Sequence, residues 1–153
     1  MRFVKNNAIW LILLPFILTA CTSASPLEEA ERKWQAQGIG SYQIEVLVVR
    51  SIWHAQYQQL TVENGMITFQ TARCVPAPFE GQTCEVEPFT AEDYTVPGLF
   101  AKASAESEKE DTTSLNITYE PTYGYPAKIV FDDPEIFDED WSWAVTSFEV
   151  LAP

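Results

Sequence analysis

YQQLTVENGMITFQ, residues 57–70, contains the clearest structural signal in the chain. Apolar residues alternate with polar ones on both sides of the Asn64-Gly65 pair, at Leu60, Val62, Ile67 and Phe69. A type I′ turn needs positive φ at both central residues, which Asn and Gly tolerate best. We therefore predict a β-hairpin with strands at residues 57–63 and 66–70, in which Ile67 and Phe69 lie on one face.

Four more segments have the β-branched and aromatic composition of strands. They are residues 42–53, 115–120, 127–132 and 141–151. Residues 121–126 are expected to form a turn between two of them, and Pro126 is expected to open the strand that follows the turn.

Two segments, residues 27–37 and 97–109, have the pattern of helices. In the first, apolar residues recur at helical spacing, glutamates occupy the first turns and Gly38 stands at the C-terminal end. Trp34 is the residue expected to dock this helix. The second has a modest apolar stripe formed by Leu99, Phe100 and Ala103. The chain order helix, strands, helix, strands predicts an α+β fold, an antiparallel sheet of five or six strands with two helices packed on one face.

The N-terminal segment, MRFVKNNAIWLILLPFILTAC, has the pattern of an export signal. Arg2 and Lys5 precede an apolar run that is too short to span a bilayer permanently. The small residues before Cys21 resemble the lipobox of bacterial lipoproteins, in which this cysteine is lipidated and becomes the first mature residue. An ordinary signal peptide with an incidental cysteine is the alternative.

The lipobox resemblance implies a division of the chain into three parts. Residues 1–20 are the signal peptide, residues 21–26 are the lipidated Cys21 and a short spacer, and residues 27–153 form a single α+β domain. Cys21 would carry acyl chains such as palmitate. We expect an exported, bacterial membrane-anchored lipoprotein that faces the periplasm or the cell exterior.

The charge balance limits the possible partners. The chain has 9 Lys and Arg against 22 Asp and Glu, and without Arg2 and Lys5 the balance is 7 against 22, or −15. Such a domain cannot neutralise phosphates, so we exclude nucleic acid as a partner. An anionic lipid surface would repel it, so membrane attachment must come through the lipid on Cys21.

The two remaining cysteines, Cys74 and Cys84, predict a disulfide. They form an even pair in a chain bound for an oxidising compartment, and they flank the stiff loop CVPAPFEGQTC. A metal site is the alternative, but zinc normally takes three or four ligands at tighter spacing, and the chain has one histidine.

Several motifs together resemble the bacterial envelope family catalogued as domain-of-unknown-function family 6174. They include W-x3-GI-x2-Y from Trp34 to Tyr42, Val62-Glu63-Asn64-Gly65, Leu99-Phe100, Tyr119-Glu120-Pro121, Tyr123-Gly124-Tyr125-Pro126 and Asp132 ahead of Glu139-Asp140. Many members have cysteines soon after the tyrosine of the first strand, whereas this chain has none there. The resemblance implies a lipoprotein and a fold, but it brings no activity and no catalytic residue.

The candidates for chemistry are few. His54, the only histidine, has no nucleophile motif such as G-x-S-x-G to accompany it, and we interpret it as a surface or turn residue at the end of the strand 42–53. The acidic loop 132–140 is the densest carboxylate cluster. Its oxygen ligands could hold Ca²⁺, with Asp132, Asp133, Asp138 and Asp140 as candidates, but the spacing does not match an EF-hand and a solvated loop is the simpler interpretation.

The PTYGYP turn places Tyr123 and Tyr125 where they could form an exposed binding surface. The alternative is that both tyrosines fold back over the sheet, because most aromatic residues near strands pack a core.

These observations favour a non-enzymatic, membrane-tethered envelope protein without a cofactor, which binds a protein, a peptide or a glycan. A carrier or chaperone for apolar ligands is the second hypothesis, and a calcium-dependent enzyme that uses the 132–140 loop is a weaker third. An open apolar cleft between the sheet and the helices would favour the carrier.

Overall fold

The computed structural model describes residues 24–51, 54–75, 84–109, 113–132 and 140–152. Its elements follow one another as α1 (Pro26–Gln37), β1 (Tyr42–Ser51), β2 (His54–Glu63), β3 (Met66–Val75), η1 (Ala91–Tyr94), α2 (Val96–Ser107), β4 (Leu115–Tyr119), β5 (Pro126–Phe131) and β6 (Trp141–Val150). Each half of the chain is therefore a helix followed by three strands.

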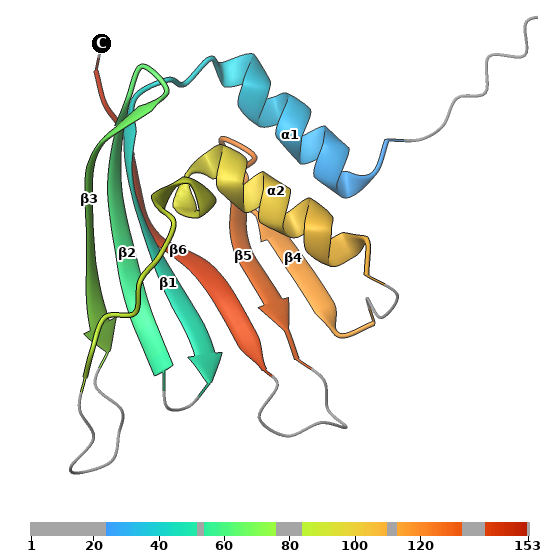
Figure 1. The fold of residues 1–153 in the computed structure, drawn as a ribbon. Helices are drawn as coiled ribbons and strands as arrows, with labels where there is room; N and C mark the ends of the chain where they lie inside the picture. The colour runs from blue at the N-terminus through green and yellow to red at the C-terminus, as the bar shows by residue number, and fades with distance from the viewer. Residues whose placement is uncertain (1–23, 52–53, 76–83, 110–112, 133–139, 153) are drawn as a thin grey trace, which may run out of the picture.

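The predicted fold class is confirmed. The six strands form one antiparallel sheet in the order β3-β2-β1-β6-β5-β4, and both helices lie on the same face of it (Figure 1). The two halves join where β1 pairs with β6, which places the last strand in the middle of the sheet. As expected, Pro126 opens its strand.

Helix α1 is defined by its ends. The Ser25 hydroxyl accepts the Glu28 N–H while the Glu28 carboxylate accepts the Ser25 N–H, which completes a capping box. Gly38 ends the helix with a φ of 62°, in the left-handed region that favours glycine. Trp34 is only 8% exposed and docks the helix on the sheet, as predicted.

The hairpin prediction is confirmed at the turn. Asn64 and Gly65 have φ values of 50° and 77°, as a type I′ turn requires. Both strands are longer than predicted, however, and a β-bulge opposite Thr61 and Val62 shifts their register. Ile67 pairs with Val62 on the inner face, whereas Phe69 pairs with Thr61 on the outer face and is 51% exposed. The prediction that the two residues share a face was wrong, because a bulge reverses the alternation.

We expect Gly65→Val to lower the free energy of unfolding by about 1–3 kcal/mol, because a β-branched residue is strained at positive φ. A urea titration followed by circular dichroism measures the change. Gly65→Asn is the matched control and should cost less, since asparagine tolerates the left-handed region. Equal stability of the parent and the valine variant would contradict the turn assignment.

The core lies between the inner face of the sheet and the helices. Tyr42, Ile44, Val46 and Val48 of β1 form its central row. The Tyr42 hydroxyl accepts the Val96 N–H at 3.1 Å and so fixes the start of α2 on the sheet. The short helix η1, which precedes α2, was not predicted from the sequence.

Candidate functional site

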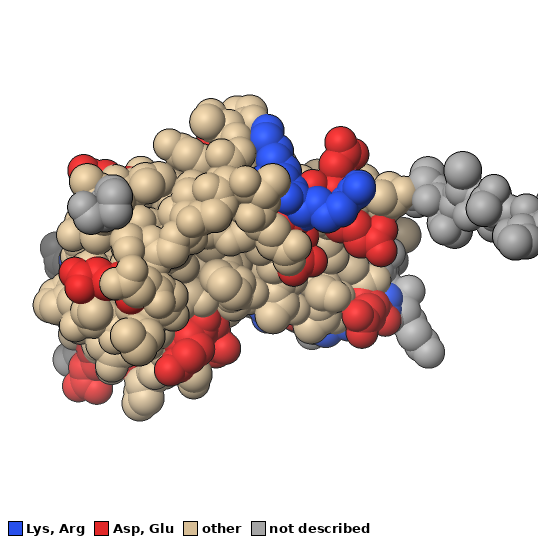
Figure 2. Space-filling model, turned by 90° about the horizontal axis from the view of Figure 1, so that it is seen from above, with Lys and Arg blue, Asp and Glu red and all other residues tan. Residues whose placement is uncertain are grey.

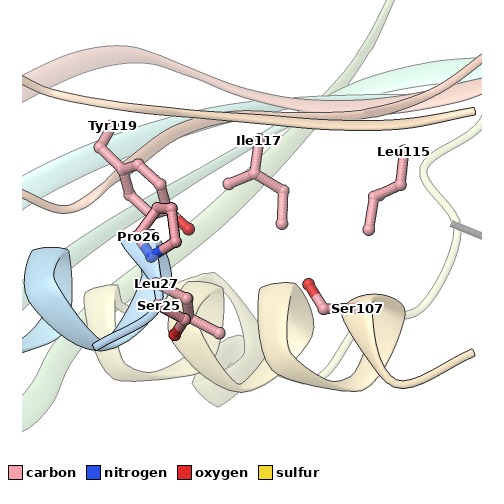
Figure 3. A pocket seen from close by; sticks show the side chains of 7 residues that line it. All are labelled: Ser25, Pro26, Leu27, Ser107, Leu115, Ile117 and Tyr119. Atoms are coloured by element: carbon pink, nitrogen blue, oxygen red, sulfur yellow. The ribbon is translucent and has the colours of Figure 1, made fainter. Parts of the chain in front are cut away.

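An open groove of about 350 Å³ lies between the edge strand β4 and the two helices. Its lining residues come from three separate segments: Ser25, Pro26, Leu27, Ser107, Leu115, Ile117 and Tyr119. Figure 3 shows the side chains of β4 pointing from the sheet toward the helices, with Ser107 of α2 opposite them. We call this hollow the β4 groove.

The alternation of β4 explains why the groove is apolar. Leu115, Ile117 and Tyr119 face inward, whereas Asn116 and Thr118 are exposed on the opposite face. Because β4 is an edge strand, its inward row has a neighbouring strand on one side only. The start of α1 and the end of α2 cover this row only in part, so its side chains are half-buried.

Both serine hydroxyls in the groove wall are already hydrogen-bonded. The Ser25 hydroxyl accepts the Glu28 N–H, and the Ser107 hydroxyl donates to the Ala103 carbonyl at 2.8 Å. Burial raises the pKa of the Tyr119 hydroxyl. None of the residues that line the groove is charged. The β4 groove therefore suits an apolar chain and not a charged ligand.

A second hollow of about 200 Å³ adjoins the first at Leu115, which lines both. Here the Glu106 carboxylate, 6% exposed, pairs with Lys102 at 2.8 Å and with Lys109 at 2.5 Å. Burial acts to raise the pKa of the Glu106 carboxyl, but the hydrogen bonds and charges of the two lysines outweigh it and hold that pKa below its ordinary value. The hollow also has an aromatic wall, formed by Phe131 and Trp141.

The PTYGYP turn packs against α1 and does not form an exposed tyrosine surface. Tyr125 is 6% exposed and lies among Trp34 and Phe148, with ring centroids 6.3 and 4.6 Å away. Burial, together with the Glu120 carboxylate and Tyr123, raises the pKa of the Tyr125 hydroxyl to about 12. The tyrosines fold back over the sheet, which was the alternative left open by the sequence.

Two features of the turn hold it in place. Gly124 has a φ of 89°, and a Cβ there would lie 2.8 Å from the Ala30 carbonyl oxygen. The Glu120 carboxylate accepts the N–H groups of Thr122 and Tyr123 at 2.8 and 2.5 Å. Burial acts to raise the pKa of Glu120, but these bonds and the Lys33 charge keep it below its ordinary value. The turn motif is therefore explained by packing.

The predicted disulfide is confirmed, with the Cα atoms of Cys74 and Cys84 5.9 Å apart. Just beyond it, Glu87 fastens the chain to the sheet, because its carboxylate pairs with Arg50 and its N–H donates to the Gln56 side chain at 3.0 Å. His54 opens β2 instead of ending the preceding strand, and its Nδ1 lies 3.4 Å from Glu87 Oε1. His54 was interpreted as a surface or turn residue, and its side chain is half-buried, with 21% exposed.

Other predicted site residues fall partly outside the described residues. Cys21 and the signal segment 1–20 lie outside them, as do Asp133 and Asp138 of the calcium candidates. Asp132 and Asp140 line a shallow hollow on the outer side of the sheet with Lys128. Within the described ranges, no three carboxylate, histidine or cysteine side chains form a metal-binding group.

Sequence reasoning missed the β4 groove and the polar residues of β2. The groove walls come from segments far apart in the chain, and the only local signal was the alternation in LNITY. Gln56 and Gln58 are buried on the inner face, where the pattern of a strand predicts apolar residues. The Gln56 amide bonds the Glu87 backbone, and the Gln58 amide has no partner among the described residues.

Comparisons with known proteins identify the family and nothing more specific. None of the described helices is long and apolar enough to cross a membrane. No curated protein and no solved structure matches the chain. The model of the family of unknown function DUF6174 matches residues 26–150, which include every described helix and strand. The chain therefore belongs to family DUF6174.

Proposed function

We propose that this chain is a membrane-tethered, non-enzymatic envelope protein that binds an apolar ligand in the β4 groove. The observation that carries the proposal is the groove itself, which is open, apolar and free of charged lining residues. Its volume lies at the lower end of the range of about 300–1,000 Å³ that is usual for small-molecule sites. A single hydrocarbon chain is the ligand that such a narrow site suits best.

The expected affinity is moderate. Burial of each CH₂ group contributes about 0.8 kcal/mol, and immobilising the chain offsets part of that gain. A site of this kind releases its ligand readily, which suits a carrier better than a permanent store. The charged Glu106, Lys102 and Lys109 cluster adjoins the groove at Leu115, where it could contact the polar end of an amphipathic ligand.

The groove predicts a difference between two substitutions on adjacent residues of β4. We expect Ile117→Glu to weaken binding of a fluorescent fatty acid at least about tenfold, because the carboxylate would face an apolar ligand. Thr118→Glu is the matched control, since this residue lies on the opposite, exposed face of the strand. Fluorescence titration of both variants measures the difference, and thermal melts show that each is folded. Equal affinity of both variants and the parent would contradict the groove as the site.

The tether predicts a change in cell fractionation. We expect Cys21→Ser to remove the lipidation site and release the protein from the membrane fraction. Immunoblotting of separated membrane and soluble fractions measures the change, with Ser23→Ala in the neighbouring spacer as the control. Retention of the serine variant in the membrane as firmly as the parent would contradict attachment through Cys21.

The outer face of the sheet supports a second candidate, binding of an envelope protein, a peptide or a glycan. None of the described helices covers this face (Figure 1). The guanidinium carbon of Arg73 lies 3.5 Å from the ring centroid of Tyr57, and Arg73 Nη2 lies 3.3 Å from Glu45 Oε2. These three residues line a shallow polar hollow. Tyr57→Ala should abolish binding of such a partner without affecting the fatty acid, and so separates the two functions.

A further inference from the structure

Cys21 precedes the wall of the β4 groove by only a few residues. Ser25 caps α1 and Pro26 begins it, and both residues line the groove. Cys21 precedes Ser25 by four residues. An extended chain spans at most about 3.6 Å per residue, so the Cα atoms of Cys21 and Ser25 are separated by roughly 14 Å or less. An acyl chain on Cys21 is therefore always within reach of the groove.

We propose that the β4 groove holds one of the acyl chains of Cys21 when the protein is in water and releases it when the protein is on a bilayer. The inference rests on the function proposed above and names what occupies the site in the absence of a membrane. On this proposal the protein shields its own lipid and blocks its own ligand site until it reaches a membrane.

The arrangement of the lining residues gives the acyl chain a direction. In Figure 3 the Ser25 to Leu27 wall lies at the Tyr119 end of the groove, and Ile117 and Leu115 follow along β4. The capping box fixes Ser25 at the start of α1, so the entry point is set by a rigid element. An acyl chain from Cys21 therefore enters beside Tyr119 and runs toward Leu115 and Ser107.

The charges near this entry are mixed in sign. Acidic and basic side chains lie beside one another on the face seen from above (Figure 2). Helix α1 carries Arg32 and Lys33, but also Glu28, Glu29 and Glu31. Attraction to anionic headgroups is therefore not what draws the acyl chain out of the groove, and the apolar interior of the bilayer must do so.

Energetics explain why the acyl chain would move. Burial of a CH₂ group gains about 0.8 kcal/mol relative to water in either an apolar site or a bilayer. In water the groove offers the acyl chain an apolar environment, and the tether makes its occupation intramolecular. On a membrane the bilayer offers the same gain with more conformational freedom, so the groove empties.

Thiol labelling of the lipidated protein tests the proposal. Ser107→Cys places a thiol in the exposed wall of the groove with little change in size, and Thr118→Cys places one on the opposite face of the sheet. Cys74 and Cys84 are bonded to each other and do not react. Maleimide labelling is followed by mass spectrometry in detergent-free buffer and on phosphatidylcholine vesicles.

We expect the Ser107→Cys thiol to react about tenfold more slowly in buffer than on vesicles. In water the acyl chain should fill the groove of most molecules, and maleimide can react only with the minor population whose groove is empty. The Thr118→Cys thiol should react at the same rate in both. Equal rates for Ser107→Cys in buffer and on vesicles would overturn the proposal. Equal slowing of both thiols in buffer would also overturn it, because aggregation and not groove occupation would be the cause.

Oleate added to the vesicle-bound protein separates this inference from the proposed function. One outcome is that oleate slows labelling of Ser107→Cys on vesicles while labelling in buffer is as fast as on vesicles without oleate. In that case the groove binds apolar ligands and only the proposal that it holds the chain's own acyl group is wrong. If labelling is equally fast in buffer, on vesicles and on vesicles with oleate, both proposals are wrong. Slower labelling both in buffer and on vesicles with oleate supports both proposals.

Discussion

Trp34→Ala is expected to lower the free energy of unfolding by about 4 kcal/mol, within the range for deleting a buried aromatic side chain. Trp34 is the main contact between α1 and the rest of the domain, with edge-to-face contacts to Tyr42, Tyr125 and Phe148 at centroid distances of 5.8, 6.3 and 5.9 Å. Alanine would remove these contacts and leave a cavity under the helix. Urea denaturation followed by circular dichroism measures the loss.

Gln35→Ala is the matched control for this substitution. Gln35 is the next residue of α1, is exposed, and makes one side-chain bond to Glu31 at 3.4 Å. Its replacement should change the free energy of unfolding by less than about 0.5 kcal/mol. A small effect of Trp34→Ala, similar to that of Gln35→Ala, would contradict the docking role of the tryptophan.

The second large effect is expected for Gly98→Ala, which should destabilise the fold by about 3 kcal/mol through overpacking. Gly98 lies in the first turn of α2, where a Cβ would come within 2.1 Å of the Glu92 carbonyl oxygen and 2.6 Å of the Asp93 backbone. Both atoms belong to η1, so relief requires movement of the backbone and not of a flexible side chain. The same denaturation measurement applies.

Gly40→Ala is the control that separates this steric effect from the general effect of replacing a glycine. A Cβ at Gly40 would lie 3.8 Å from the Asn64 Cα, which is an ordinary contact. We expect it to change the free energy of unfolding by less than about 1 kcal/mol in either direction. Similar losses for the two alanine variants would show that close contact of α2 with η1 is not the cause.

The elements of the fold could be predicted because their signals are local. The Asn64-Gly65 turn and the Gly38 helix end each depend on a few neighbouring residues. The bulge that separates Ile67 from Phe69 could not be predicted, because a bulge depends on pairing with β2 and leaves no mark in the alternation of β3 itself.

The candidate site was less accessible to sequence analysis for a physical reason. The β4 groove exists because three segments meet in space and because β4 lies at the edge of the sheet, and neither fact is encoded in a short motif. The PTYGYP motif, by contrast, drew attention as a binding surface, yet Gly124 and Tyr125 are required there for packing against α1. A distinctive motif can thus mark a tight turn and not a ligand site.

The position of β6 bears on how the chain is made. β6 is the last strand in the sequence, yet it pairs with β1 on one side and β5 on the other, so Tyr42 near the start of the domain is matched with Val150 near its end. Before β6 emerges, the two halves of the sheet have no strand to join them. Completion of the sheet must therefore wait until β6 has been synthesised, and these long-range pairings are of the kind that slows folding.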